Sequence, residues 1–243
     1  MSSVHGRKER KIIILNEYNQ PVDPTKEVVK ELGSFLGTLV RSGTFCRLNV
    51  FNWRKLDAKD DMWKYIKEKY DIPDEAKQWV FESVCSAWRK YKSQLKATHF
   101  TAYENDDRPV DVPESHFKYL LKYWNSDSHK KMSETNTENR SKLKCPHTDG
   151  RTPFALIHEE KKKEVSDTSD TLSSKDIFVA TRKTKLGRVY KSSYDNTISK
   201  IAEMERIQST QESEDDSHSV DAFASVMGHE HLGRVRLYGQ GLC

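Results

Sequence analysis

The chain has 243 residues, of which 35% are hydrophobic and 32% are charged, and its formal net charge at pH 7 is +4. Such a polar composition excludes one extensive hydrophobic core and favours a modest helical domain with solvated tails. No signal peptide or apolar stretch of roughly 20 residues is present, and the four cysteines form no CxxC pair, as is typical of a soluble intracellular protein with reduced thiols.

Residues 1–22 are predicted to form a basic N-terminal segment, in which the β-branched run from Lys11 to Leu15 favours one short strand. Asp23 as the N-cap and Pro24 as the first helical residue then predict the start of a helix. Apolar residues recur at helical spacing from Val28 to Leu39, so this helix is expected to have one buried side.

The clearest predicted helix runs from Pro73 to about Thr98. Apolar residues recur along it in steps of three or four and form one stripe, made of Ala76, Val80, Val84, Ala87, Tyr91 and Leu95. By helical geometry an adjacent face carries the basic residues, with Trp88 between the two faces; these basic residues are Arg89, Lys92, Lys96 and His99. We expect the side chains of Arg89, Lys92 and Lys96 to be exposed.

A second long helix is predicted from Pro113 to about Lys144. Its first part has an apolar side made of Phe117, Leu120, Leu121 and Trp124. Beyond Asn125 the helix loses this stripe and becomes polar and basic, so this part is expected to be solvated or to lie on a partner.

These elements make residues 23–163 a predicted helical domain. Residues 164–176 are rich in Ser, Thr and Asp and are predicted to be a flexible linker. Residues 177–243 are predicted to form a poorly ordered C-terminal helical segment, with an amphipathic helix from Ile198 to Ile207, an acidic connector and a Gly-rich tail. The predicted fold class is therefore mainly α, a small helical domain with long amphipathic helices and flexible acidic linkers.

Catalysis by carboxylates that hold two metal ions requires a rigid sheet, because the metals tolerate little displacement of their ligands. This chain has few strand-like segments, and its aspartates fall where helix caps or loops are expected, namely Asp57, Asp60, Asp61, Asp71, Asp74, Asp106, Asp107 and Asp111. The cysteines and histidines lack the paired spacing of tetrahedral zinc sites. We therefore predict no enzyme activity, no metal site and no cofactor.

Positive charge dominates from Arg89 to Lys144, and a polyanion such as DNA would bind there with release of its counterions. The candidate DNA-contacting residues are Trp88, Arg89, Lys92, Lys96, Lys122, Lys130, Lys131, Asn139, Arg140, Lys142 and Lys144. Asn136 carries the same amide group as Asn139 and is likewise suited to contact a base or a phosphate. Two ordinary alternatives stay open: a lysine-rich helix face is often only a solvated surface, and a tryptophan at helical spacing usually belongs to the core.

Three segments carry distinctive residue patterns. They are WVxxSVxxAWRxYKxxLK from Trp79, YWNSxxxxKxSExNxxNRxKL from Tyr123 with PHTxG and FA after it, and VMGxExxGRVRxYGxG from Val226. These segments resemble the plant transposase family of the Ptta/En/Spm (CACTA) elements, over roughly Leu32 to Gly241. The resemblance implies a nuclear protein of the non-catalytic accessory type, because the catalytic partner of these elements is a separate protein.

The sequence therefore predicts a transposon-derived, non-catalytic DNA-binding protein. Its expected partner is DNA, and either a second copy of the chain or the element-encoded catalytic transposase is a further candidate partner. Two alternatives remain: a protein-interaction or oligomerisation module, and a degenerate element remnant without retained activity.

Overall fold

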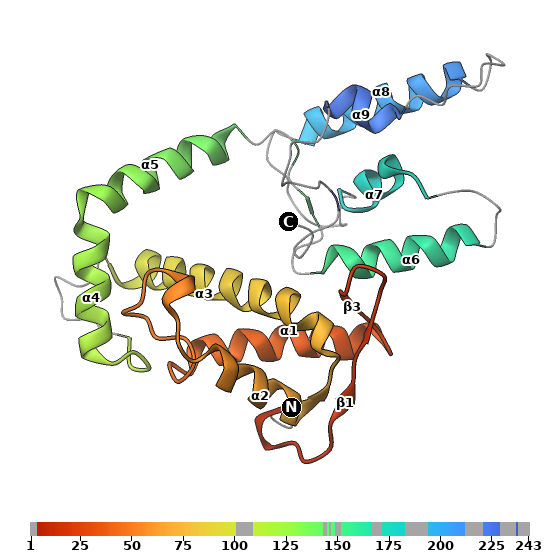
Figure 1. Ribbon diagram of the computed structural model, residues 1–243. Coiled ribbons are helices and arrows are strands. Elements are labelled where there is room, and N and C mark those ends of the chain that lie inside the picture. Colours follow the sequence, from red (N-terminus) through yellow and green to blue (C-terminus); the bar gives the residue numbers. More distant parts are fainter. Residues whose placement is uncertain are drawn as a thin grey trace. The chain divides into compact units, whose positions relative to one another are not determined.

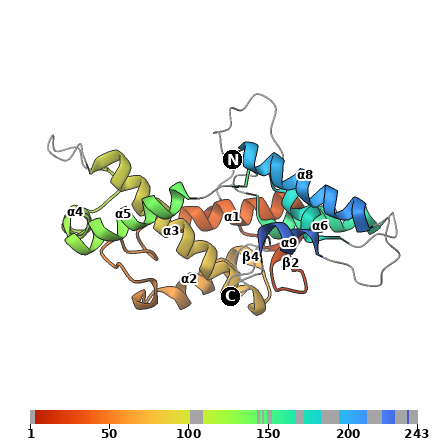
Figure 2. The same cartoon turned by 90° about the horizontal axis from the view of Figure 1, so that it is seen from above.

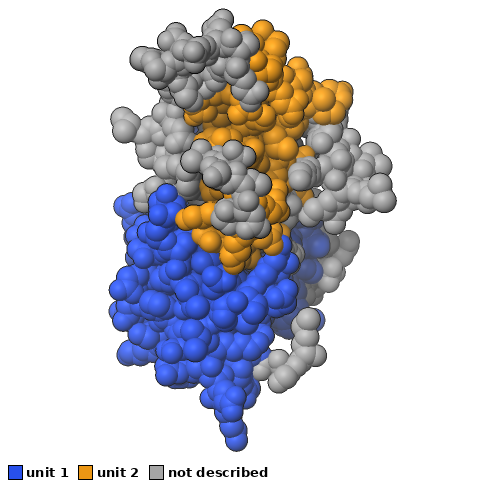
Figure 3. All heavy atoms as spheres, turned by 90° about the vertical axis from the view of Figure 1, so that its right-hand side faces the viewer, with its two compact units in different colours: residues 1–138 blue, residues 139–243 orange. Residues whose placement is uncertain are grey.

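The computed structural model describes residues 4–100, 109–142, 145, 147–148, 152–166, 172–182, 194–211, 221–228 and 237. Over these residues the chain is mainly α-helical, with only short strands of two or three residues (Figure 1), which confirms the predicted fold class. The chain divides into two compact units, residues 1–138 and 139–243 (Figure 3). This division falls inside the predicted helical domain 23–163, at a position where the polar sequence carried no linker signal.

The first unit is built around helix α1 (Lys26–Arg41), which packs against helix α3 (Lys77–His99) (Figures 1 and 2). The buried side of α1 has the predicted helical spacing, with Val29, Leu32, Phe35, Leu36, Leu39 and Val40. The N-cap is Thr25, whose Oγ1 accepts a hydrogen bond from the backbone N–H of Val28 at 3.3 Å. The predicted cap, Asp23, is instead the last residue of a strand, which explains the later helix start.

The predicted strand near the N-terminus is split in two. Strand β1 (Lys11–Ile12) pairs in parallel with β4 (Tyr70–Asp71), and β2 (Ile14–Leu15) pairs antiparallel with β3 (Pro21–Asp23). Ile13, between β1 and β2, is buried, and its N–H donates to the Asp71 carbonyl at 2.9 Å. The burial of Ile13 fixes the chain between β1, which pairs with β4, and β2, which pairs with β3.

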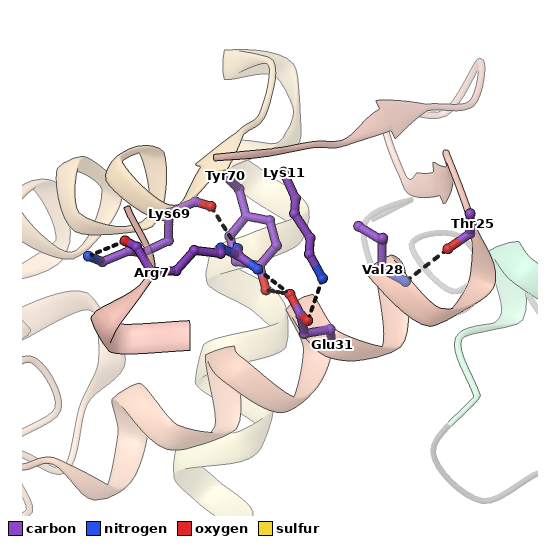
Figure 4. A network of polar contacts seen from close by, with 7 residues as sticks. All are labelled: Arg7, Lys11, Thr25, Val28, Glu31, Lys69 and Tyr70. Carbon is purple, nitrogen blue, oxygen red and sulfur yellow. Dashed lines mark hydrogen bonds and ion pairs between the residues drawn. The ribbon is translucent and has the colours of Figure 1, made fainter. Parts of the chain in front are cut away.

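A polar cluster around Glu31 fastens the N-terminal segment to the first unit (Figure 4). Its carboxylate accepts hydrogen bonds from Arg7 at 2.5 Å, from Lys11 at 2.7 Å and from the Tyr70 hydroxyl at 3.0 Å. Burial alone would raise the pKa of Glu31, but these three donors outweigh it and lower the pKa to about 2. Part of the predicted N-terminal segment 1–22 is therefore folded onto α1 and β4.

Helix α2 (Lys59–Lys69) and three short 3₁₀ turns complete the scaffold of this unit, the turns being η1 (Val4–Gly6), η2 (Trp53–Lys55) and η3 (Asp74–Ala76). Met62, Trp63, Ile66 and Tyr70 point inward, as their spacing predicts. The predicted stripe is buried at Ala76 in η3 and at Val80, Val84 and Leu95 on α3, and half-buried at Ala87 and Tyr91.

The predicted helix from Pro113 to about Lys144 is two helices, α4 (Glu114–Asn125) and α5 (Asp127–Ser141). The break lies at Ser126, whose backbone is extended, with φ −67° and ψ 143°. Its Oγ accepts from the N–H of His129 at 3.3 Å and donates to the Tyr123 carbonyl at 2.7 Å. Ser126 thus caps α5 at its start, and a serine followed by an acidic residue was the sequence signal for this break.

The second unit contains α6 (Phe154–Ser166), α7 (Ser174–Ala180), α8 (Tyr194–Gln211) and α9 (Ala222–Met227). Its own small core comprises Cys145, Ile177, Phe178, Met204, Ala222, Phe223 and Leu237. Residues at both ends of the predicted linker 164–176 are ordered, because α6 extends to Ser166 and a capping box between Ser173 and Asp176 starts α7. Residues 167–171 lie outside the described part.

Candidate nucleic-acid interface

Trp88 belongs to the core of the first unit. Its side chain is 1% exposed and its ring centroid lies 5.8 Å from that of Trp53. Trp88, one of the candidate DNA-contacting residues, is buried instead, and the alternative that it is a core tryptophan is confirmed. Trp124 is also buried, at 3% exposure.

Lys92 is tied to the same aromatic cluster. Its Nζ lies 3.2 Å from the centroid of the Trp88 ring and donates to the Val50 carbonyl at 3.2 Å. Burial lowers the pKa of Lys92 to about 8, because the surrounding apolar groups disfavour the charged form. The ammonium group is therefore part of the packing between α3 and the chain around Val50 and Phe51.

Lys96 is turned toward the start of α5. Its Nζ lies 3.1 Å from Nε2 of His129, and the His129 ring lies 4.6 Å from the ring of Tyr123. Tyr123 in turn stacks on Phe51 at 4.1 Å. These contacts pack α3, α4 and the first turn of α5 together in one junction.

The predicted exposed face of three cations on α3 is therefore wrong for two of its members. Lys92 and Lys96 are half-buried and have internal partners, whereas Arg89 is exposed. Helical periodicity placed these residues on one side of α3 correctly. It could not show that Val50, Phe51 and His129 would cover that side.

The other candidates lie on α4, on α5 and just after it. Exposed side chains are found at Lys122, Lys130, Lys131, Asn139, Arg140 and Lys142. Lys144 lies outside the described residues. The structure thus brings five candidates into one short stretch, from Lys130 to Lys142, and leaves Arg89 and Lys122 on separate helices.

Helix α5 differs from the other long helices because none of its residues is buried. A helix that is polar all round gains no stability from a packed apolar face. Here the described contacts with the core are confined to the first turn, through His129 and the Ser126 cap. The remainder of α5 presents its side chains to solvent or to a partner.

The segment that carries this helix also matches a known family. Residues 113–242, more than half of the chain, match the plant transposase family Ptta/En/Spm. The chain belongs to this family. No curated protein and no solved structure matches it.

The match to the Ptta/En/Spm family begins at Pro113, so it includes α4, α5 and the second unit. The upstream pattern that begins at Trp79 lies outside the match. The candidate residues from Lys122 onward are therefore in the matched segment, whereas Trp88, Arg89, Lys92 and Lys96 are not. Membership of this family identifies the protein as transposon-derived.

Five aspartates of the first unit form ion pairs. Ion pairs join Arg10 to Asp71, Arg47 to Asp57, Lys64 to Asp61, Lys67 to Asp74 and Lys77 to Asp60. Asp106 and Asp107 lie outside the described residues. Within the described part of the chain, no group of three or more His, Cys, Asp or Glu residues gathers as a metal site would require, and no helix is long and apolar enough to cross a membrane.

The cysteines of the first unit are not poised for nucleophilic chemistry. Cys46 and Cys85 are buried, and burial raises the pKa of both thiols, to about 12 for Cys46. A thiol with a raised pKa holds its proton at neutral pH and packs as a small apolar group.

Proposed function

We propose that this member of the Ptta/En/Spm family is a non-catalytic DNA-binding protein that acts in the nucleus. The observation that carries the proposal is α5, a 15-residue helix without a buried side chain that lies in the segment matched to the family. Such a helix is free to enter the major groove, which admits an α-helix. The basic residues on and after it supply the charge that attracts phosphates.

The surface that we propose for DNA contact, called the α5 surface below, comprises Lys130, Lys131, Asn139, Arg140 and Lys142. Arg89, Lys122 and Lys144 are proposed as peripheral phosphate contacts. Trp88, Lys92 and Lys96 are left out, because their packing within the first unit already explains their residue types.

Two features support a non-catalytic role. The aspartates from Asp57 to Asp74 are engaged in ion pairs that join loops and helices, and the described strands are too short to form the sheet on which paired metal ligands are held. The catalytic step of transposition would then come from a separate element-encoded transposase. We expect that the isolated chain with Mg²⁺ or Mn²⁺ neither nicks nor joins DNA, and metal-dependent cleavage that disappears on changing one aspartate would contradict this.

The DNA-binding proposal is tested by the dependence of affinity on salt. The parent chain should bind duplex DNA, and the triple change Lys130→Ala, Lys131→Ala and Lys142→Ala should make the slope of log affinity against log salt shallower, by up to about 0.9 for each phosphate that the variant no longer neutralises. A matched control removes three exposed lysines of the first unit, Lys8→Ala, Lys30→Ala and Lys64→Ala. Equal effects of the two triple changes, or no binding by the parent chain at low salt, would refute the proposal.

A second candidate function is self-association through α8. The spacing predicts that Ile198, Ile201, Met204 and Ile207 share a buried side, but Ile198 is 52% exposed whereas the adjacent Thr197 is buried. Ile198 is therefore available for an apolar contact with a second copy. Sedimentation velocity on the parent and on Ile198→Glu would detect it, and a monomeric parent would remove this candidate.

A further inference from the structure

We infer that α5 reads base edges in the major groove of duplex DNA through one defined side, made of Met132, Asn136, Asn139 and Arg140. We call it the reading face. The inference rests on the proposed DNA-binding function and deepens it, because it names the side chains that distinguish one sequence from another. It follows from the distribution of charge around α5, from the exposure of its side chains, and from the chemistry of the four residues.

The acidic residues of α5 all lie on one side. At about 100° per residue, Asp127, Glu134 and Glu138 fall within an arc of about 40°. Lys130 and Lys131 flank this arc, and each has a carboxylate three or four residues away, as has Lys142. The lysines lie at the edges of the acidic side, where they can meet phosphates at the rim of the groove. The acidic side itself suits solvent better than the floor of the groove.

The opposite side carries no carboxylate. Met132, Asn136 and Arg140 follow one another at intervals of four residues and form a row along the helix, with Asn139 beside it. All four side chains are exposed. Arg140 is the only lysine or arginine of α5 without an acidic residue three or four positions away. Its charge is therefore not offset by such a neighbour and is available to a ligand on this side.

Contacts at the first turn anchor the start of α5. The His129 ring is held between Tyr123 and the Lys96 ammonium group. Ser126 caps the same turn. The first turn of α5 is thus held against α3 and α4 within the first unit.

The side chains on the reading face have the chemistry of base recognition. Arginine donates two parallel hydrogen bonds to O6 and N7 of guanine, asparagine pairs with N6 and N7 of adenine, and an apolar group such as Met132 suits the methyl group of thymine. Two asparagines and one arginine on a face without carboxylates match the exposed edge of a purine-containing site.

The experiment selects bound sequences from random duplex DNA with the full-length parent chain and with three variants. Arg140→Lys keeps the positive charge but removes the paired donors, Asn136→Ala removes one amide, and Thr135→Ala is the matched control at an exposed position outside the reading face. None of these residues is buried, so circular dichroism should show an unchanged helical content.

We expect the parent to enrich one sequence, and Arg140→Lys and Asn136→Ala each to lower its advantage over random DNA by about 10- to 100-fold, with relaxed preference at one base position. Thr135→Ala should leave the enriched sequence unchanged. If Arg140→Lys relaxes the preference for one guanine, replacing that guanine by 7-deazaguanine should weaken the parent but not the variant, because N7 is then missing.

Salt-dependent binding by the parent without any enriched sequence would overturn this inference and leave the proposed function intact. The same holds if a sequence is enriched equally by the parent, Arg140→Lys and Asn136→Ala. Absence of any binding by the parent would overturn the proposed function itself, so the two failures are distinguishable.

Discussion

The Nζ of Lys96 lies 3.1 Å from Nε2 of His129, although the two residues are 33 positions apart in the sequence. The ammonium group can only donate, so Nε2 is the acceptor and the proton of the neutral imidazole lies on Nδ1. Nδ1 is buried and makes no hydrogen bond within the described residues. The contact therefore requires a neutral histidine, and it fixes the side of α5 that faces α3.

The stability of this junction between α3 and the first turn of α5 should depend on pH. Burial, and then the charge of Lys96, lower the pKa of His129 below its ordinary value of 6.5, so the unfolded chain binds the proton more readily. The stabilisation is fully present above about pH 6.5 and is lost progressively as the pH falls toward the pKa of the folded state. Hydrogen exchange at the first turn of α5, followed between pH 7 and 5, should show faster opening at the acid end.

His129→Gln should reduce this pH dependence, because the glutamine amide oxygen accepts from Lys96 without titrating. Lys96→Met should also reduce it, since the protonated ring then meets no neighbouring cation at this contact. An unchanged pH dependence of exchange in His129→Gln would show that another group is responsible.

Glu31→Gln should destabilise the first unit at neutral pH by about 1–3 kcal/mol, because Arg7, Lys11 and Tyr70 lose their common carboxylate. The lowered pKa of Glu31, about 2, means that its contribution is present above pH 4.5 and is lost as the pH falls toward 2. Urea unfolding at pH 7 and pH 3 measures both effects. Glu27→Gln, on the exposed side of the same helix, is the control and should change stability much less.

Replacing Lys92 should mainly lower the stability of the fold, whereas replacing Arg89 should mainly weaken the salt dependence of DNA binding. Lys92→Met should lower the free energy of unfolding by about 1–3 kcal/mol, because it removes the cation–π interaction with Trp88 and the hydrogen bond to Val50, while the salt dependence of DNA binding stays the same. Arg89→Ala should change stability by about 0.5 kcal/mol or less and make the salt slope shallower. A stable Lys92→Met with a shallower slope would return Lys92 to the DNA surface.

Trp88→Ala should be among the most damaging single changes in the first unit. The side chain is 1% exposed and contacts Trp53 and Lys92, so truncation leaves a cavity and costs about 3–5 kcal/mol. Thermal unfolding followed by circular dichroism measures the decrease in stability. A variant as stable as the parent would indicate a tryptophan that serves binding instead of packing.

The helical fold class, the buried side of α1 and most of the apolar stripe of α3 could be read from residue spacing. Periodicity of three to four residues places apolar groups on one side of a helix whatever packs there, so it predicted Val80 and Val84 as core residues. The patterns around Tyr123 and Val226 pointed to the family in the same local way, and the match over residues 113–242 confirms it.

Which cations are available to a ligand was decided by tertiary structure. Arg89, Lys92 and Lys96 look equivalent in a helical projection, yet Val50 and Phe51 come from a loop about 40 residues earlier in the chain, and His129 from another helix, to cover two of them. Local spacing contains no information about such distant neighbours. The sequence determined the sides of each helix and the lack of an apolar side on α5, and only long-range packing determined that Lys92 and Lys96 are covered whereas Arg89 is not.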